Sequence, residues 1–410
     1  MDYKIYTLPN GIRLLHTPFQ STITHACIVI NAGSRDEAEN KDGLAHFIEH
    51  LLFKRTEKRN TGQILNRLEA VGGDLNAYTT KEYTCIHASF LNPHLERALD
   101  LFEDLVFHSV FPEDEMKKEK GVVLDEIASY EDQPEEAIND DFEDLLFQGH
   151  ALGRNILGTE ETVTGFERSD IENFIKTNYN TEEITIGVIG SYDERKILRM
   201  FTKIFERIPT NNTPKQRTGV NGYLPHSISQ AKSIAQTHCV LGNRAYSIHD
   251  DRKTPLLLLN NILGGTGMSS RLNLQIREKY GIAYTIESNY TPLTDTGIFS
   301  IYFGTDSEKK DKALKLVDKE LRSLRETKIG GVQLHRAKQK FIGQIALGEE
   351  NRMGLIIAMC KNLLDYGKVE TLEEIFAKIN AVSADEIIEV ANDVLNPANI
   401  SCLLFEPSEQ

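Results

Sequence analysis

The chain has 410 residues, of which 40% are hydrophobic and 26% charged, an ordinary globular composition that excludes a disordered or fibrous protein. Its 46 Lys and Arg residues against 61 Asp and Glu residues give a net charge of -15, which disfavours a general nucleic-acid binder. No apolar run approaches the ~20 residues of a membrane span, and the N-terminus lacks the pattern of a secretory signal. The five cysteines form no CxxC pair, which argues against a disulfide framework and favours a reducing compartment, so we expect a cytoplasmic protein.

The first half of the chain mixes strands and helices without a regular βαβ rhythm. Asn10-Gly11 between two β-prone runs predicts a hairpin of strands 4–8 and 12–16. Further strands are expected at 26–31, within 76–90 and at 184–189, and helices from 43, over 61–71, over 92–110 and over 112–130. This mixture predicts an α+β fold.

A segment rich in Pro, Asn, Gly and Thr, residues 208–227, lies near the midpoint and is typical of an interdomain linker. After it the order of elements recurs: a strand at 231–241, helices at 255–263 and 269–280, β-rich sequence at 283–303, a helix at 309–326 and a long helix from 332. This recurrence predicts an internal duplication into two homologous α+β domains, 1–215 and 216–410, each a mostly antiparallel sheet packed with helices.

The segment from Gly43 to Phe53 carries the strongest chemical signal. On a helix its apolar residues share one face, whereas His46, Glu49 and His50 share the other. Two histidines one turn apart converge on one cation, and zinc suits such ligands. Glu49 is poorly placed to bind the same ion and instead suits a general base, as in HxxEH, the inverse of the HExxH motif. The alternative is a solvated helical face that happens to carry these residues.

A catalytic zinc site needs a third protein ligand, and the helix over 112–130 offers two carboxylates. Glu119 and Glu126 lie two turns apart on a face that is otherwise apolar, with Met116, Val122, Val123, Ile127 and Tyr130. Buried carboxylates require a cation or strong donors, so one of them could bind the ion and the other could hold a ligand histidine. Alternatively, this face is only partly buried and pairs with Lys or Arg.

These residues resemble the pitrilysin-like (inverzincin) zinc metallopeptidases, especially the short two-domain members related to the mitochondrial processing peptidase β subunit and bacterial processing peptidases. The similarity rests on residues 46–50, on Glu126 at the distance of the distal glutamate and on Glu119 seven residues before it. It extends over nearly the whole chain, through residues 9–11, 73–79, 150–154 and 264–284. The resemblance implies His46, His50 and Glu126 as ligands of one Zn²⁺ per chain, Glu49 as general base, and Glu119 as a support for the ligands.

Two further groups of residues are implied by the same resemblance. Asn76, Ala77, Tyr78 and Thr79 match the strand on which family members lay an extended substrate, although a plain core strand is the alternative. Arg277 and Tyr284 match an Arg and a Tyr that reach the substrate, where a guanidinium holds a peptide carbonyl and a phenol donates to an oxyanion. The alternative for this pair is an ordinary helix end.

The second half lacks the metal ligands. The helix beginning at Pro255 has no histidine, and aligning Gln344 with Glu126 puts Ala337 opposite Glu119. Only the first half is therefore expected to hold zinc.

The sequence thus predicts a zinc-dependent endopeptidase that cleaves peptides or unfolded or presequence segments through a metal-activated water, with Glu49 as general base. In related two-domain enzymes the Arg and Tyr reach the zinc site from a partner chain, so we expect a homodimer, or else a hetero-oligomer. The alternative function is a non-catalytic scaffold or partner subunit of a hetero-oligomeric processing peptidase.

Overall fold

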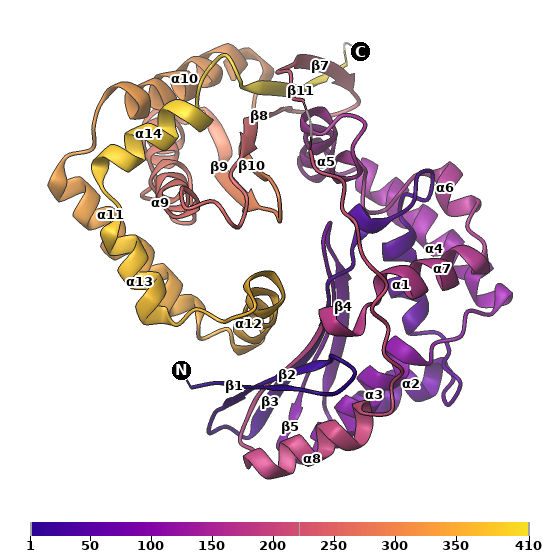
Figure 1. The fold of residues 1–410 in the computed structure, drawn as a ribbon. Coiled ribbons are helices and arrows are strands. Elements are labelled where there is room, and N and C mark those ends of the chain that lie inside the picture. The colour runs from indigo at the N-terminus through magenta and orange to yellow at the C-terminus, as the bar shows by residue number, and fades with distance from the viewer. Residues whose placement is uncertain (1, 221, 409–410) are drawn as a thin grey trace. The chain divides into compact units, whose positions relative to one another are not determined.

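The computed structural model describes residues 2–220 and 222–408, which form two compact units (Figure 1). Unit 1 comprises the chain up to Ala128, Arg154–Arg217 and Gly348–Thr371; unit 2 comprises Ser129–Gly153, Thr218–Leu347 and the chain from Leu372 onward. These units differ from the continuous segments 1–215 and 216–410, because each takes in one segment of the other half.

Unit 1 is built on a six-stranded sheet of order β1-β2-β6-β3-β5-β4. Its strands are β1 (Lys4–Thr7), β2 (Arg13–Pro18), β3 (Ile23–Ile30), β4 (Asp74–Thr79), β5 (Thr84–Leu91) and β6 (Ile184–Gly190). The expected N-terminal hairpin is confirmed, since β1 and β2 pair antiparallel with Lys4 opposite His16. β2 and β6 run parallel, the other described pairs run antiparallel, and β4 lies at an edge of the sheet.

Helices cover both faces of this sheet. They are α1 (Leu44–Leu52), α2 (Thr61–Glu69), α3 (Leu95–Phe107), α4 (Glu113–Glu131), α6 (Glu160–Thr164), α7 (Arg168–Asn178), α8 (Glu194–Phe205) and α12 (Arg352–Tyr366). In β3, Ala26 and Ile28 face the core with α1 and α3, whereas Cys27 and Val29 face α12. Because both faces are buried there, residues 26–30 of the strand are continuously apolar rather than alternating.

Unit 2 contains a five-stranded sheet of order β7-β11-β8-β10-β9. Its strands are β7 (Ser227–Lys232), β8 (Thr237–Ala245), β9 (Ala283–Pro292), β10 (Gly297–Thr305) and β11 (Ser401–Pro407). Its helices are α5 (Pro134–Leu146), α9 (Lys253–Leu263), α10 (Lys310–Glu326), α11 (Gly331–Gly348), α13 (Leu372–Ala381) and α14 (Ala384–Val394), with a π-helical segment over Asn273–Glu278. α5 packs on β8 and β11, while α9 and α14 belong to the core on the other face.

The two sheets share one topology. The order β2-β6-β3-β5-β4 in unit 1 matches β7-β11-β8-β10-β9 in unit 2, and both contain a parallel pair at the matching position, β2 with β6 and β7 with β11. The second face of each sheet is covered by a helix from the other half of the chain, α12 in unit 1 and α5 in unit 2. The prediction of two α+β domains with mostly antiparallel sheets is therefore confirmed.

One predicted strand is wrong. The segment 231–241 spans the end of β7 and the start of β8 rather than forming one strand. The break is required because β7 and β8 are not neighbours: β11 lies between them, and the chain must cross it.

The expected linker has no helix or strand over 209–220 and 222–226, and its first part is fixed on unit 1 by buried ion pairs. Lys215 Nζ lies 2.8 Å from Asp36 Oδ2, and Arg217 Nε lies 2.9 Å from Asp36 Oδ1. This anchored stretch ends at Arg217, where the chain leaves unit 1 and enters unit 2. No helix in the described part of the chain combines the length and apolar character needed to cross a membrane.

Candidate metal centre

Helix α1 is positioned at its first turn by a buried carboxylate that sequence reasoning missed. Glu37 accepts hydrogen bonds from the backbone N–H groups of Gly43 (3.0 Å) and Ala45 (2.8 Å). Burial raises the pKa of Glu37, and these two N–H groups oppose that rise. Gly43 has φ of 91°, and a Cβ there would meet the carbonyl oxygen of Leu157 at 2.5 Å, so this position requires glycine. The only sequence signal was an acidic residue shortly before the helix.

The apolar face of α1 anchors it as the helical spacing predicts. Leu44, Phe47, Ile48, Leu51 and Leu52 are all buried in the core of unit 1. The opposite face presents His46, Glu49 and His50, of which His46 is buried and the other two are half-buried.

The structure brings His46, His50 and Glu126 together, with one ligand atom from each lying within 4.8 Å of the others. The two Nε2 atoms are 3.2 Å apart, and Glu126 Oε2 lies 3.7 Å from His46 Nε2 and 3.5 Å from His50 Nε2. Zinc bonds of about 2.0–2.1 Å in a tetrahedron would separate neighbouring ligand atoms by roughly 3.3–3.4 Å. The three side chains therefore fit a zinc ion.

Glu119 does not join this cluster but contacts the far side of one histidine. Its Oε2 lies 3.2 Å from His50 Nδ1, and its Oε1 lies 2.5 Å from Lys54 Nζ. A carboxylate on Nδ1 fixes the tautomer that leaves the Nε2 lone pair free for a metal. Lys54 was not predicted, although its spacing of four residues from His50 on the same segment was a readable signal.

The other contacts of α4 refine the predicted face. Glu119 and Val123 are buried, but Val122 is 47% exposed, so the expectation that Val122 belongs to the buried stripe is wrong. Glu126 keeps 43% of its side chain exposed, which leaves its carboxylate reachable from solvent. The side chain of Val122 is open to solvent instead.

The environment of His46 favours its neutral, metal-binding form. Burial, and then the charge of His50, lower the pKa of His46 to about 4. Its Nδ1 is buried and has no hydrogen-bond partner among the described residues. A neutral imidazole is the form that coordinates a metal ion.

Glu49 lies outside the converging cluster and is held by the edge strand. Thr79 Oγ1 donates a 2.7 Å hydrogen bond to Glu49 Oε2. Burial raises the pKa of Glu49, and the hydrogen bond from Thr79 opposes that rise. An oriented carboxylate with a raised pKa has the properties of a general acid or base.

The predicted substrate strand is β4, which pairs with β5 on one side only. Its residues have different environments: Asn76 is exposed, Ala77 packs against the core beneath α1, and Tyr78 packs toward α12 with its hydroxyl 3.3 Å from that of Tyr83. Thr79 is the member that contacts the candidate site, through Glu49. The free edge of β4 offers unpaired backbone groups to an added strand.

Arg277 and Tyr284 belong to unit 2, where both line a cavity of about 390 Å³ beside the loop 264–267. Arg277 lies on the π-helical segment, and Tyr284, 61% exposed, lies at the start of β9. Both side chains are accessible rather than packed in the core.

The position in unit 2 that aligns with Glu126, the predicted metal ligand, carries a neutral hydrogen-bonded pair. Gln344 Nε2 donates to the carbonyl oxygen of Thr266 (2.6 Å), and Asn261 Nδ2 donates to Gln344 Oε1 (2.7 Å). Among the described residues, the cluster of unit 1 is the one group of three or more His, Cys, Asp and Glu side chains whose ligand atoms converge.

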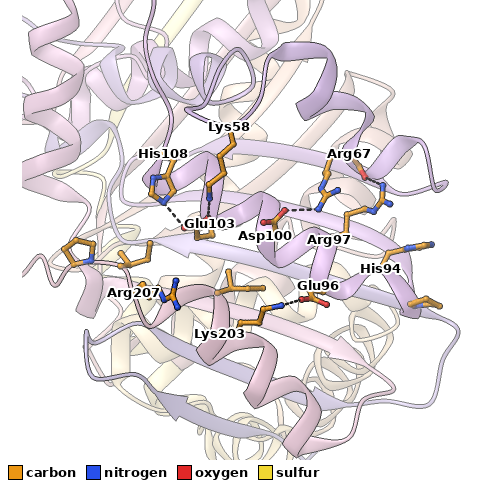
Figure 2. A pocket seen from close by; sticks show the side chains of 14 residues that line it. Lys58, Arg67, His94, Glu96, Arg97, Asp100, Glu103, His108, Lys203 and Arg207 are labelled. Carbon is orange, nitrogen blue, oxygen red and sulfur yellow. Dashed lines mark hydrogen bonds and ion pairs between the residues drawn. The ribbon is translucent and has the colours of Figure 1, made fainter.

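A further cavity of unit 1, about 740 Å³, holds none of the predicted residues (Figure 2). Three of its cations contact carboxylates of the same cavity: Lys58 with Glu103 (3.2 Å), Arg67 with Asp100 (2.9 Å) and Lys203 with Glu96 (2.8 Å). These three cations therefore already have carboxylate partners in the wall of the same cavity.

Fold and site together define a duplicated α+β protein with a candidate zinc centre on an HxxEH helix of its first domain. Residues 14–160 match the family model for insulinase (peptidase family M16), and residues 165–341 match that for the peptidase M16 inactive domain. An uncharacterized zinc protease of Bacillus subtilis, YmxG, is 32% identical over 410 residues, which are 99% of this chain and 98% of that protein. The chain belongs to peptidase family M16.

A further sequence relative and two solved structures are similar to this chain over most of its length. An uncharacterized zinc protease of Streptomyces coelicolor is 32% identical over 397 residues, covering 95% of this chain and 86% of that protein. A protease from Helicobacter pylori has the same fold, with a TM-score of 0.90, 21% identity and 99% of each chain covered. A peptidase M16 inactive domain structure from Pseudomonas fluorescens gives a TM-score of 0.89 at 19% identity, covering 100% of this chain and 98% of that one.

Proposed function

We propose that this chain is a zinc-dependent endopeptidase that cleaves peptides or unfolded polypeptide segments, including presequences, with one Zn²⁺ per chain. The observation that carries the proposal is the convergence of His46, His50 and Glu126 within 4.8 Å. Family membership and relatives named as zinc proteases support the choice of metal and of reaction.

In this proposal, separate residues bind the metal, transfer the proton and orient the ligands. A zinc ion held by His46, His50 and Glu126 would polarise the scissile carbonyl and lower the pKa of water. Glu49 takes the proton of the attacking water and returns it to the leaving amine, and Thr79 orients its carboxylate. Glu119, held by Lys54, orients His50 for coordination.

Substrate recognition in this proposal uses the free edge of β4 and the accessible pair of unit 2. An extended peptide adds as a strand beside residues 76–79, so main-chain hydrogen bonds supply affinity for many sequences. Arg277 holds a peptide carbonyl, and Tyr284 donates to the developing oxyanion. A preference for unfolded segments follows, because only an extended backbone can pair with a strand edge.

The Glu49→Gln variant tests the general base. We expect peptide cleavage to fall by roughly 10²–10⁴-fold, because the amide cannot accept the proton. The zinc content, measured by plasma mass spectrometry after gel filtration, should not change. Glu69→Gln, at an exposed position of α2, is the matched control and should retain full cleavage. Full activity of Glu49→Gln would contradict the assignment, and wild-type protein without zinc would favour the scaffold alternative.

A homodimer is part of the proposal, each copy supplying Arg277 and Tyr284 to the site of the other. Mixing the inactive variants Glu49→Gln and Arg277→Ala tests it. In a mixed dimer one site combines an intact Glu49 with an intact Arg277, so partial activity should return. No recovery in a mixture that gel filtration shows to have exchanged subunits would contradict the shared site.

A further inference from the structure

Unit 2 contains a second cavity, about 630 Å³, that the proposed catalytic roles do not use. It lies among the last residues of α9, the segment 269–275, the end of α10 with the residues after it, and the first half of α11. Its volume is within the range of about 300–1,000 Å³ typical of ligand sites. It shares Asn261 with the cavity that holds Arg277 and Tyr284.

The cavity is cationic, although the chain carries a net charge of -15. Its charged lining consists of four cations, Arg271, Lys328, Arg336 and Lys340, and one carboxylate, Glu320. Two of the cations are already paired: Arg271 contacts Glu320 at 2.9 Å, and Lys328 contacts Asp385 at 2.6 Å.

The other two cations, Arg336 and Lys340, have no carboxylate partner among the described residues. Arg336 and Lys340 lie one turn apart on the same side of α11. Neither forms a hydrogen bond or ion pair with any residue in the described part of the chain. Burial lowers the pKa of Lys340, with no carboxylate opposing it. In the cavity of Figure 2, by contrast, Lys58, Arg67 and Lys203 hold carboxylates of the cavity itself.

Asn261, which lines the cavity, carries a buried acceptor without a donor. Gln344 must turn its Nε2 toward the carbonyl oxygen of Thr266, so its Oε1 accepts from Asn261 Nδ2. The remaining polar atom of Asn261 is therefore Oδ1. Asn261 is 5% exposed, and Oδ1 is buried with no hydrogen-bond partner among the described residues. An unsatisfied buried acceptor costs about 1–3 kcal/mol unless a ligand or water donates to it.

We infer that this cavity binds a carboxylate group of a peptide, with Arg336 and Lys340 facing the carboxylate. A peptide with an acidic side chain or a free C-terminus carries the anion that these two residues require. Because Asn261 lines both cavities, a peptide that contacts Arg277 and Tyr284 would lie next to the cationic one. The inference rests on the proposed function and gives the peptidase a preference for acidic side chains or for a free chain end.

Three dansylated eight-residue peptides of otherwise identical sequence test the inference. One has a central Glu and an amidated end, one a central Gln and an amidated end, and one a central Gln and a free carboxylate. Their affinities are measured by fluorescence anisotropy on full-length Glu49→Gln protein, which should bind without cleaving. We expect at least one carboxylate peptide to bind about tenfold more tightly than the neutral peptide, equivalent to about 1.4 kcal/mol. Whichever carboxylate peptide shows the preference identifies its source.

Variants of α11 locate the effect. Added to Glu49→Gln, the pair Arg336→Gln and Lys340→Gln should abolish the preference, whereas Arg336→Lys with Lys340→Arg should keep it. Lys315→Gln, an exposed position on α10 outside the cavity, is the charge-matched control and should also keep it. Thermal melting verifies that the variants fold.

Two results would overturn the inference: equal affinity for all three peptides, or a preference that survives the Gln pair. Cleavage by the wild-type chain is a separate readout. A cleaving enzyme without carboxylate preference rejects only this cavity, whereas a preference in a chain that never cleaves rejects only the peptidase proposal.

Discussion

The two units contain sheets of the same strand order and a matching pair of helices at the same point in the order of elements. These pairs are α1 with α4 in unit 1 and α9 with α11 in unit 2. In unit 1 the facing side chains are two imidazoles and a carboxylate, with ligand atoms 3.2–3.7 Å apart. In unit 2 an asparagine and a glutamine meet instead and bond to each other at 2.7 Å. One backbone arrangement thus supports two different kinds of contact.

The difference teaches how the identity of a few side chains decides whether such a helix pair needs an ion. Lone pairs of His46, His50 and Glu126 point at one another, and only a cation satisfies all three. The amides of Asn261 and Gln344 carry both donors and acceptors, so they can satisfy each other without one. Of the pair, Asn261 Oδ1 is the polar atom left without a partner among the described residues.

Removing a ligand from unit 1 is expected to have the largest effect. The free energy of zinc binding is roughly 10–16 kcal/mol for a site of about four ligands. Loss of one ligand in His50→Ala should therefore weaken zinc binding by at least ~10²-fold and abolish cleavage. Competition with a chromophoric chelator measures the affinity. Gln344→Ala in unit 2 is the counterpart and should leave zinc affinity unchanged. Equal zinc loss from both variants would erase the difference between the two helix pairs.

Removing Glu119, which contacts His50, should weaken zinc binding less than removing a ligand does. Glu119→Gln replaces a carboxylate that lies 3.2 Å from His50 Nδ1 and 2.5 Å from Lys54 Nζ. Loss of such a contact should weaken zinc binding about 10–100-fold while leaving a cleavable site at saturating zinc. The same chelator titration measures it. Ala337→Gln, at the aligned position of α11, is the control; unchanged affinity in Glu119→Gln would show that this contact only fills space.

The amide pair of unit 2 should contribute to stability and not to metal binding. Gln344→Met leaves the buried Asn261 amide without its acceptor, so the free energy of unfolding should fall by about 1–3 kcal/mol. Urea unfolding followed by circular dichroism measures the change. Gln339→Met, an exposed position of α11, should shift it by less than ~0.5 kcal/mol. A matching loss in the control would attribute the effect to helix propensity.

Restoring the carboxylate in unit 2 should have no effect on metal content. Gln344→Glu gives α11 the residue that α4 carries at Glu126, but α9 has no histidine to complete a cluster. Zinc per chain, measured by plasma mass spectrometry, should remain at the wild-type value. A second equivalent of zinc would show that the helix geometry, and not the histidines, selects the ion.

Much of the candidate centre was predictable because helical periodicity is a local property. The spacing of Leu44, Phe47 and Ile48 placed His46 and His50 on the opposite face of one helix, and the structure agrees. Spacing alone could not separate Glu119 from Glu126, because both lie on one face of α4. Their different contacts arise from the way α4 crosses α1.

Other features depend on residues far apart in the chain and had no local signal. Glu37 reaches the first turn of α1 only because the loop before the helix folds back on it. Likewise, α5 and α12 cover the sheets of the opposite halves, which periodicity cannot reveal because any apolar helix face fits any apolar sheet face.

By itself, the sequence determined the α+β mixture, the repeated order of the main elements and the chemistry of the HxxEH helix, since each follows from side-chain pattern over a few turns. Tertiary structure alone decided which carboxylate joins the histidines, which helix covers each sheet, and that two cations of α11 line a cavity without a carboxylate partner. These outcomes depend on distances between elements, which packing sets and local pattern does not encode.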